Sequence, residues 1–154
     1  MNKPRLLALA RFLDNLSPER FNYETVIVRP YQDCGAAGCA IGWCPAVPEL
    51  SKYIYWASES PNHQLYDDLM KTSKIENASC VMMKRTGSTD FVDVGMQLFS
   101  LTEEDSSYLF MPDKKYDGAS TPKMVAKKIR EFIKTSDKIK KGKKKVIRGQ
   151  KEGY

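Results

Sequence analysis

The pattern of apolar and polar residues predicts an amphipathic helix near each end of the chain. Between about Pro4 and Leu16, one helical face carries Leu6, Leu9, Ala10, Leu13 and Leu16, and this face is expected to be buried. Thr121-Pro122 opens the last predicted helix, because a capping hydroxyl followed by proline is a preferred helix start. One side of that helix carries Val125, Ile129, Phe132 and Ile133.

Two further helices are predicted between these ends. After Thr89, a potential cap, apolar residues recur with helical spacing at Phe91, Val94, Gly95, Leu98 and Phe99. Thr102 then places a hydroxyl before Glu103, Glu104 and Asp105, and three acids suit the positive end of a helix dipole. The helix that begins after Thr102 is expected to reach Phe110.

The rest of the pattern predicts short elements. Residues 23–28 are rich in β-branched side chains and indicate a strand that Pro30 ends, and residues 80–83 indicate another. Residues 62–71 suggest a short helix, residues 52–56 fit either state, and a helical turn is expected at Ser17-Pro18-Glu19. We therefore predict a mainly α fold, a compact helical domain with at most a small sheet; an α+β fold is the alternative.

Residues 33–43 are the densest stretch of special residues in the chain. Glycines and alanines there allow other backbone segments to come close, and Trp43 offers a large apolar surface for them to pack on. Pro45 and Pro48 limit any helix through this region to a couple of turns. We interpret the stretch as a structural hub formed by Cys34, Gly35, Cys39, Gly42 and Trp43.

Length and composition favour one soluble domain with a basic extension. The 154 residues suffice for a single core, and 42% apolar with 29% charged residues is typical of a globular protein. No apolar run approaches the roughly 20 residues that span a bilayer. The first apolar run is interrupted by Arg11 and Asp14, so an export signal is not expected and a cytoplasmic location, in a bacterial or infected cell, is predicted.

Charge is distributed unevenly along the chain. Residues 1–122 hold 12 basic and 16 acidic residues, whereas residues 123–154 hold 13 basic and 3 acidic residues. We predict a globular domain over 1–135 and a flexible basic tail over 136–154, because the tail is too poor in apolar residues to fold alone. Its cations can displace counterions from a phosphate backbone. The predicted nucleic-acid-binding residues are Lys138, Lys140, Lys141, Lys143, Lys144, Lys145 and Arg148.

Other uses of the tail stay open from the sequence. It could keep the protein soluble, or tether it electrostatically to an acidic protein or an anionic membrane. Tyr154 is the only aromatic residue after Phe132, so base stacking by the tail itself is not expected.

Cysteine and histidine residues raise the question of a metal or a nucleophile. A zinc site could draw on Cys34, Cys39, Cys44 and His63, with Cys80 as a further candidate ligand. The cysteines are five residues apart, however, whereas in a zinc knuckle only two residues separate them. Buried free thiols are the favoured interpretation. A catalytic pair of Cys34 with His63 is a minor hypothesis, and no glycine loop matches a phosphate cradle. We expect no cofactor and no enzymatic activity.

Part of the sequence resembles a known family. Cys34-Gly35, Cys39 and Gly42-Trp43 resemble the Cys-Gly-Thr-x-x-Cys-x-x-Gly-Trp signature of small uncharacterised bacterial and phage-encoded proteins, with Ala36 in place of the threonine. Residues 101–110 and the helix behind them resemble a Leu-Thr-x-x-Glu-x-x-x-Leu-Phe segment that often follows in those proteins. The resemblance implies a phage or mobile-element protein, and implies no reaction.

Two functions of different classes follow from these observations. The first is a non-enzymatic accessory protein that associates with nucleic acid through its basic C-terminal residues. The alternative is a phage-encoded inhibitor or adaptor that binds a host defence protein, and a small zinc-binding module is a further alternative.

Overall fold

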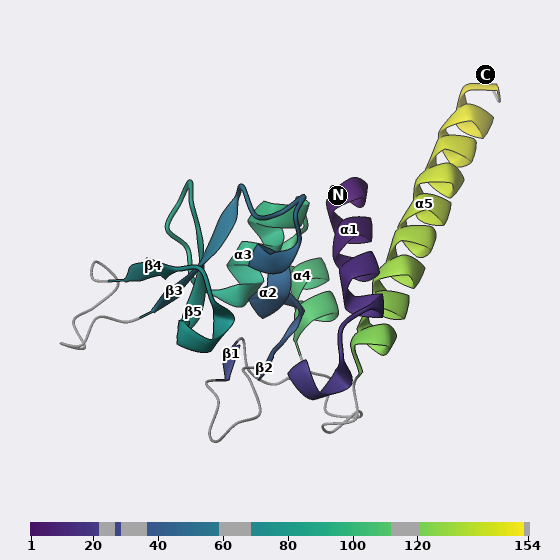
Figure 1. The fold of residues 1–154 in the computed structure, drawn as a ribbon. Helices are drawn as coiled ribbons and strands as arrows, with labels where there is room; N and C mark the ends of the chain where they lie inside the picture. Colours follow the sequence, from purple (N-terminus) through teal and green to yellow (C-terminus); the bar gives the residue numbers. More distant parts are fainter. Residues whose placement is uncertain (22–26, 29–36, 59–68, 112–120, 153–154) are drawn as a thin grey trace.

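The computed structural model describes residues 1–21, 27–28, 37–58, 69–111 and 121–152. In this part of the chain there are five α-helices: α1 (Lys3–Asp14), α2 (Ala40–Trp43), α3 (Phe91–Phe99), α4 (Glu103–Phe110) and α5 (Pro122–Glu152). Short 3₁₀ turns follow α1 and α2, at Pro18–Arg20 and Cys44–Ala46. Figure 1 shows the helices on one side of the molecule and a small sheet on the other. The predicted mainly α fold with a small sheet is thus confirmed.

Helix α1 lies against several other elements at once. The Asn2 side chain caps its start by accepting a hydrogen bond from the Arg5 backbone N–H at 3.2 Å. The Arg5 guanidinium donates to the Leu98 carbonyl at 2.9 Å, which places a cation at the negative end of α3. The same guanidinium lies 3.9 Å from the centroid of the Tyr53 ring. Arg5 therefore joins α1 to both α3 and the segment that leads into the sheet.

The sheet has three antiparallel strands in the order β4 (Met70–Thr72), β3 (Ile54–Ser58), β5 (Cys80–Met83). The central strand β3 pairs Ile54 with Met83 on one side and Ser58 with Met70 on the other. A separate antiparallel pair joins β1 (Ile27–Val28) to β2 (Ala37–Gly38). Ile54 shares one face of the sheet with its partner Met83 and with Val81, all three are buried in the core, and this face is the one presented to the helices; Ala57 is buried on the opposite face.

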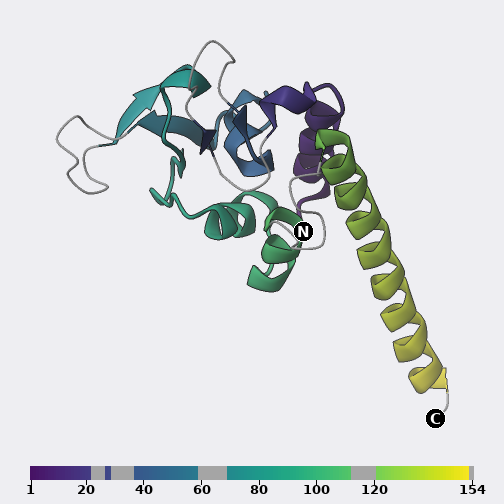
Figure 2. The same ribbon diagram turned by 90° about the horizontal axis from the view of Figure 1, so that it is seen from below.

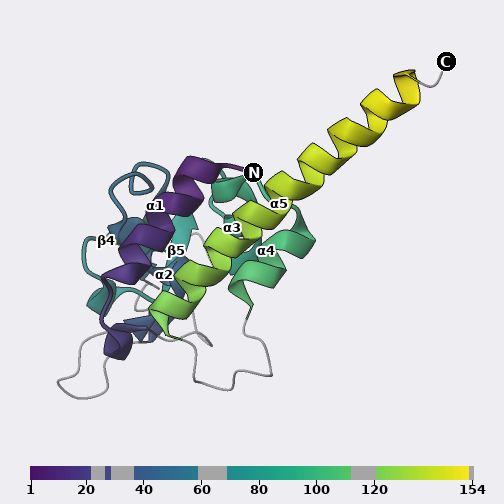
Figure 3. The same ribbon diagram turned by 90° about the vertical axis from the view of Figure 1, so that its right-hand side faces the viewer.

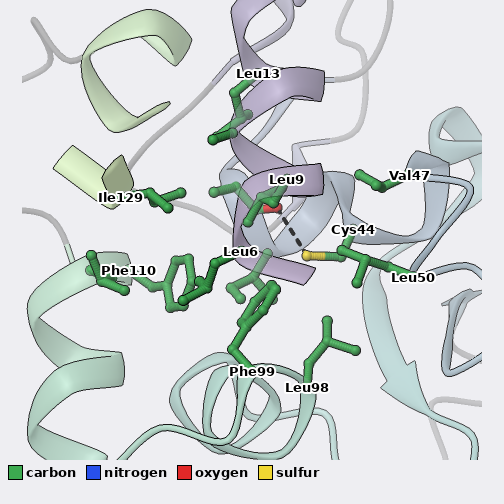
Figure 4. Packing of buried hydrophobic residues seen from close by; sticks show 14 of the residues in the cluster. Leu6, Leu9, Leu13, Cys44, Val47, Leu50, Leu98, Phe99, Phe110 and Ile129 are labelled. Atoms are coloured by element: carbon green, nitrogen blue, oxygen red, sulfur yellow. Dashed lines mark hydrogen bonds between the residues drawn. The ribbon is translucent and has the colours of Figure 1, made fainter. Parts of the chain in front are cut away.

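The core is formed mainly by α1 and by the helices that surround it. Figure 4 shows Leu6, Leu9 and Leu13 of α1 pointing among side chains from the other helices. On α3 and α4, the Phe99 and Phe110 rings stack with centroids 5.5 Å apart. Burial of this continuous apolar surface is the main force that stabilises the fold. Side chains that are fully buried here are Leu6, Leu9, Leu13, Ile41, Leu50, Ile54, Leu98, Phe99, Leu109 and Ile129.

The predicted structural hub is described in part, since Cys34 and Gly35 lie outside the described residues. Cys39, Gly42 and Trp43 are all buried, and the Trp43 side chain is 5% exposed. The Trp43 indole N–H donates to the Arg20 carbonyl at 2.8 Å. The polar edge of the ring is thereby satisfied while its apolar faces are packed.

Three local predictions differ from the structure. Residues 70–72 form strand β4, whereas a helix was predicted to end there. Pairing with β3 outweighs the local apolar spacing. Residues 62–68 of the predicted helix lie outside the described residues. Asp90, not Thr89, caps α3, since its carboxylate accepts from the Asp93 backbone N–H. The last helix ends at Glu152 instead of near Ile133.

The C-terminal half of α5 extends beyond the body. Figure 2 shows this part of the helix projecting away from the other elements. Lysine is a good helix former, and adding residues to a helix that is already nucleated is easier than starting one. The segment predicted as a tail over 136–154 is therefore helical through residue 152, and its flexibility stays a prediction. Within the described residues, α5 and the other helices are each too short or too polar to span a bilayer.

Candidate nucleic-acid interface

The first half of α5 is fixed to the body by apolar contacts. Figure 3 shows α5 crossing the helical side of the molecule, with α1 on one side and α4 on the other. The side of α5 that faces the core is defined by its buried residues, Val125, Ala126, Ile129 and Ile133. These residues are spaced by one, three and four positions, which places them on one helical face. The opposite face of α5 is left to solvent.

Two ion pairs set α5 on α1. Arg130 binds the Asp14 carboxylate with both terminal nitrogens, one of which, Nη1, lies 3.2 Å from Oδ1. The hydrogen bond from Arg130 lowers the pKa of Asp14 from its ordinary value. Lys3, in the first turn of α1, pairs with Asp137 of α5. Because the pairs lie at opposite ends of α1, they fix the direction in which α5 leaves the body.

The solvent face of α5 carries a line of cations that we call the basic row. Its described members, Lys123, Lys127, Lys134 and Lys138, are all exposed. Lys141, Lys145 and Arg148 occupy the helical positions that continue the line. Successive members are three, four or seven residues apart, so that all seven share one helical face. From residue 123 to residue 148 the row is about 38 Å long, at about 1.5 Å per residue.

Acidic residues interrupt this positive surface very little. Glu131 is exposed on the same helical face, between Lys127 and Lys134, and is the acidic residue that interrupts the row; the Asp137 carboxylate is paired with Lys3. A line of mostly positive charges along one helical face attracts polyanions, and the attraction falls as salt screens it. A row of this length is comparable to one turn of a nucleic-acid duplex, which rises about 34 Å. The arrangement can therefore contact several phosphates at once.

The structure places the predicted nucleic-acid-binding residues all on one helix, but not all on one face. Lys138, Lys141, Lys145 and Arg148 belong to the basic row, whereas Lys140, Lys143 and Lys144 occupy other positions around α5. Lys123, Lys127 and Lys134 belong to the row and were missing from the prediction. Their spacing from Lys138 is the signal that would have found them, once the helix is continued past Thr135.

Beside the basic row lies a second line of residues, which we call the apolar strip. It consists of Met124, Phe132 and Ile139 on α5 together with Tyr108 on α4. The Tyr108 and Phe132 ring centroids are 6.3 Å apart, and Lys128 Nζ lies 4.5 Å from the Tyr108 centroid. Lys128 follows Met124 by one helical turn and precedes Phe132 by another, so the strip runs along α5 parallel to the row.

The two described thiols in and beside the hub, Cys39 and Cys44, are buried. Cys44 donates to the Ala40 carbonyl at 3.4 Å, as Figure 4 shows, and burial raises its pKa well above the ordinary thiol value. Burial also raises the pKa of Cys39, while Cys80 is half-buried. No group of three His, Cys, Asp or Glu side chains that could hold a metal ion is found among the described residues. Cys34 and His63, the other predicted ligands and the proposed catalytic pair, lie outside them.

Comparison of the chain with protein-family models, with curated proteins and with solved structures finds no match.

Proposed function

We propose that this protein is a non-enzymatic accessory protein that binds nucleic acid through the basic row of α5. The observation that carries the proposal is the alignment of the row: four described lysines are exposed on one face of a helix that is fixed to the core at its other face, with Glu131 between the second and the third. The row is positioned by packing and ion pairs, so little conformational freedom is lost when phosphates bind. The resemblance of the hub to the phage-encoded signature supports an origin in a phage or mobile element.

Binding of this kind is electrostatic and independent of base sequence. Lysine ammonium groups contact phosphates as point charges, and they carry no information about base identity. Dissociation constants of roughly 10⁻⁴ to 10⁻⁶ M at physiological salt are typical of such contacts. We expect the logarithm of the binding constant to fall linearly with the logarithm of salt concentration, because each neutralised phosphate releases counterions.

A matched pair of triple variants tests the role of the row. The first variant changes Lys127, Lys134 and Lys138 to Gln, and the control changes Lys71, Lys74 and Lys84 to Gln, which are exposed lysines outside α5. Both lose three charges, so bulk charge affects them equally. Fluorescence anisotropy with an unrelated oligonucleotide, from 50 to 200 mM salt, measures the salt dependence of each. The row variant is expected to reduce the slope by about 2 to 3 and the control by less than about 0.5.

Two outcomes would contradict this proposal. Equal effects of the two variants would assign the binding to net charge rather than to the row. Failure of the unmodified protein to bind any oligonucleotide at 50 mM salt would contradict the proposed nucleic-acid binding as a whole. Affinity purification from the host with and without nuclease then tests the alternative, because a host protein that copurifies after nuclease treatment would favour an inhibitor or adaptor.

A further inference from the structure

We propose that the ligand is a single-stranded nucleic acid, with its phosphates on the basic row and its bases on the apolar strip, where Tyr108 is the stacking platform. This inference rests on the proposed function and specifies the form of nucleic acid that it takes. It draws on residues of α4 and α5 that the electrostatic argument does not use.

Tyr108 has the setting that base stacking requires. Its side chain is 57% exposed although it lies on a helix whose neighbouring residues Leu109 and Phe110 are buried. Phe132 packs beside the ring at 6.3 Å, and the Lys128 ammonium lies 4.5 Å from its centroid. Two residues of α5 thus hold the ring in place, with the Lys128 ammonium over the ring, while the residue stays largely in solvent, where a flat apolar partner can reach it.

The strip extends away from Tyr108 in both directions along α5. Met124 is 44% exposed and Ile139 is 55% exposed, so large apolar groups remain in solvent over about four helical turns. Met111, which follows α4 and is 47% exposed, adds to the apolar surface at the Tyr108 end. These apolar residues are aligned along α5 with Lys128 among them, and exposed apolar residues that gather on one face mark a binding site more often than scattered ones do.

The relative position of the two lines favours a single strand over a duplex. Row and strip run side by side along α5, since Lys123 is followed by Met124 and Lys138 by Ile139, and adjacent residues are about 100° apart around a helix. A single strand can turn its phosphates toward one line and its unpaired bases toward the other. The bases of a duplex are stacked inside it, so a duplex can reach the row but cannot stack on Tyr108.

Charge complementarity also favours a nucleic acid over a second copy of the chain. Burial of the strip against another copy would bring two basic rows close together, and repulsion between them would oppose that contact. A polyanion whose bases are apolar on their faces matches both lines at once.

Three variants of Tyr108 separate stacking from other contributions. Anisotropy at 50 mM salt measures binding of 20-nucleotide oligo-dT and oligo-U and of a 20-base-pair duplex by the full chain. Tyr108→Phe keeps the ring, Tyr108→Leu keeps apolar surface without a flat ring, and Tyr108→Ala removes both. We expect Phe to bind both single strands within twofold of the unmodified protein, and Leu and Ala to bind them about 5- to 100-fold more weakly. Duplex binding should change less than twofold in all three.

A photochemical readout supports the same test. Oligo-dT that carries 5-iododeoxyuridine is expected to cross-link to Tyr108 on irradiation, and mass spectrometry identifies the peptide. Salt-dependent binding that is equal for Tyr108→Ala and the unmodified protein on single strands would overturn the inference and leave the proposed function standing. Absence of all binding would overturn both. A shift from dimer to monomer in sedimentation of Tyr108→Ala would overturn the inference by assigning the strip to self-association.

Discussion

The Trp43 and Trp56 indoles meet edge to face, with ring centroids 6.3 Å apart and planes at 80°. Trp43 comes from α2 and Trp56 from the central strand β3, so the contact joins the hub to the sheet. The Trp56 N–H donates to the Gly42 carbonyl at 2.8 Å, which anchors the same junction through the backbone. On its other side Trp43 contacts Phe12 of α1, at 5.9 Å between centroids. One ring therefore packs against both layers of the fold.

Replacement of this ring should strongly destabilise the body. We expect Trp43→Ala to lower the free energy of unfolding by about 3 to 5 kcal/mol, because it leaves a large cavity in the junction. Trp43→Phe keeps an aromatic ring and loses the hydrogen bond to the Arg20 carbonyl, so a smaller loss is expected. Urea unfolding followed by circular dichroism measures both. A loss below about 1 kcal/mol for Trp43→Ala would show that the ring is not a packing centre.

Gly95 allows α3 and α4 to approach closely. A Cβ atom at this position would overlap the Ser106 hydroxyl and would lie 2.9 Å from the Phe110 ring. Ser106 is fully buried and donates to the Val92 carbonyl at 2.7 Å, so it has little freedom to move. We expect Gly95→Ala to destabilise the protein by about 1 to 3 kcal/mol in thermal or chemical unfolding, despite the higher helix propensity of alanine.

A double-mutant cycle identifies the cause of that effect. Ser106→Ala removes the hydroxyl that the new methyl group would meet. Gly95→Ala should therefore cost less in the Ser106→Ala background than alone, by at least about 0.5 kcal/mol. Strict additivity of the two substitutions would mean that the two helices are not in contact through these residues.

The Asp14 and Arg130 pair makes stability depend on pH at the acidic end. Since the native pKa of Asp14 is lowered, its contribution is complete above the ordinary value of 3.8 and is lost as pH falls further toward the native value. Both side chains are 37% exposed, so solvent screens the pair, and Asp14→Asn should cost only about 0.5 to 1 kcal/mol at pH 7. The difference between the two proteins should vanish as pH is lowered from about 4 through the native pKa of Asp14.

The ion pair of Arg11 and Glu49 offers a matched control for that measurement. Its two charged atoms are 3.8 Å apart and its side chains are 64% and 56% exposed. Glu49→Gln should therefore leave the free energy of unfolding unchanged within error. If the two variants behave alike across the pH series, the Asp14 contact has no special role in fixing α5.

The buried thiols should be protected from reagents in the folded protein. In a variant with Cys34→Ser and Cys80→Ser, Cys39 and Cys44 are expected to react with a disulfide reagent at pH 8 only as fast as the protein unfolds. Burial raises the pKa of both thiols, so little reactive thiolate is present. Addition of denaturant should make both thiols react with the reagent at the same time. Rapid reaction of either thiol in the native state, or its protection by added zinc, would contradict the buried interpretation.

Helix positions followed from local signals, whereas strand pairing did not. Thr102 does cap α4, since its hydroxyl accepts from the Asp105 N–H at 3.1 Å, and caps of this kind depend only on neighbouring residues. Strand β4 forms because Met70 pairs with Ser58 of β3, twelve residues away. The apolar spacing within residues 69–72 does not indicate this pairing. The contact between Gly95 and Ser106 was hidden for the same reason.

The positive charge of the candidate interface could be predicted from the sequence, but the helical arrangement of its residues could not. The excess of cations after residue 122 is visible in the sequence. Low apolar content predicts a lack of structure beyond Thr135, whereas a helix that has started on a core can continue through lysines with no further core contact. Lys123 and Lys138 lie on one helical face because the helix continues past Thr135. Tyr108 lies next to Lys128 because α4 packs beside α5, which the sequence alone does not indicate.

The packing of α1 on α5 also bears on how the polypeptide reaches its native state during synthesis. Asp14 and Arg130 are separated by 116 residues, so the most central helix waits for its partner until nearly all the described chain has left the ribosome. Until then the side of α1 that packs on α5 has no cover, and transiently exposed apolar surface of this kind favours aggregation of a nascent chain. The same late event completes the hydrophobic interior and orients the surface that meets the ligand, so incompletely made copies would lack both.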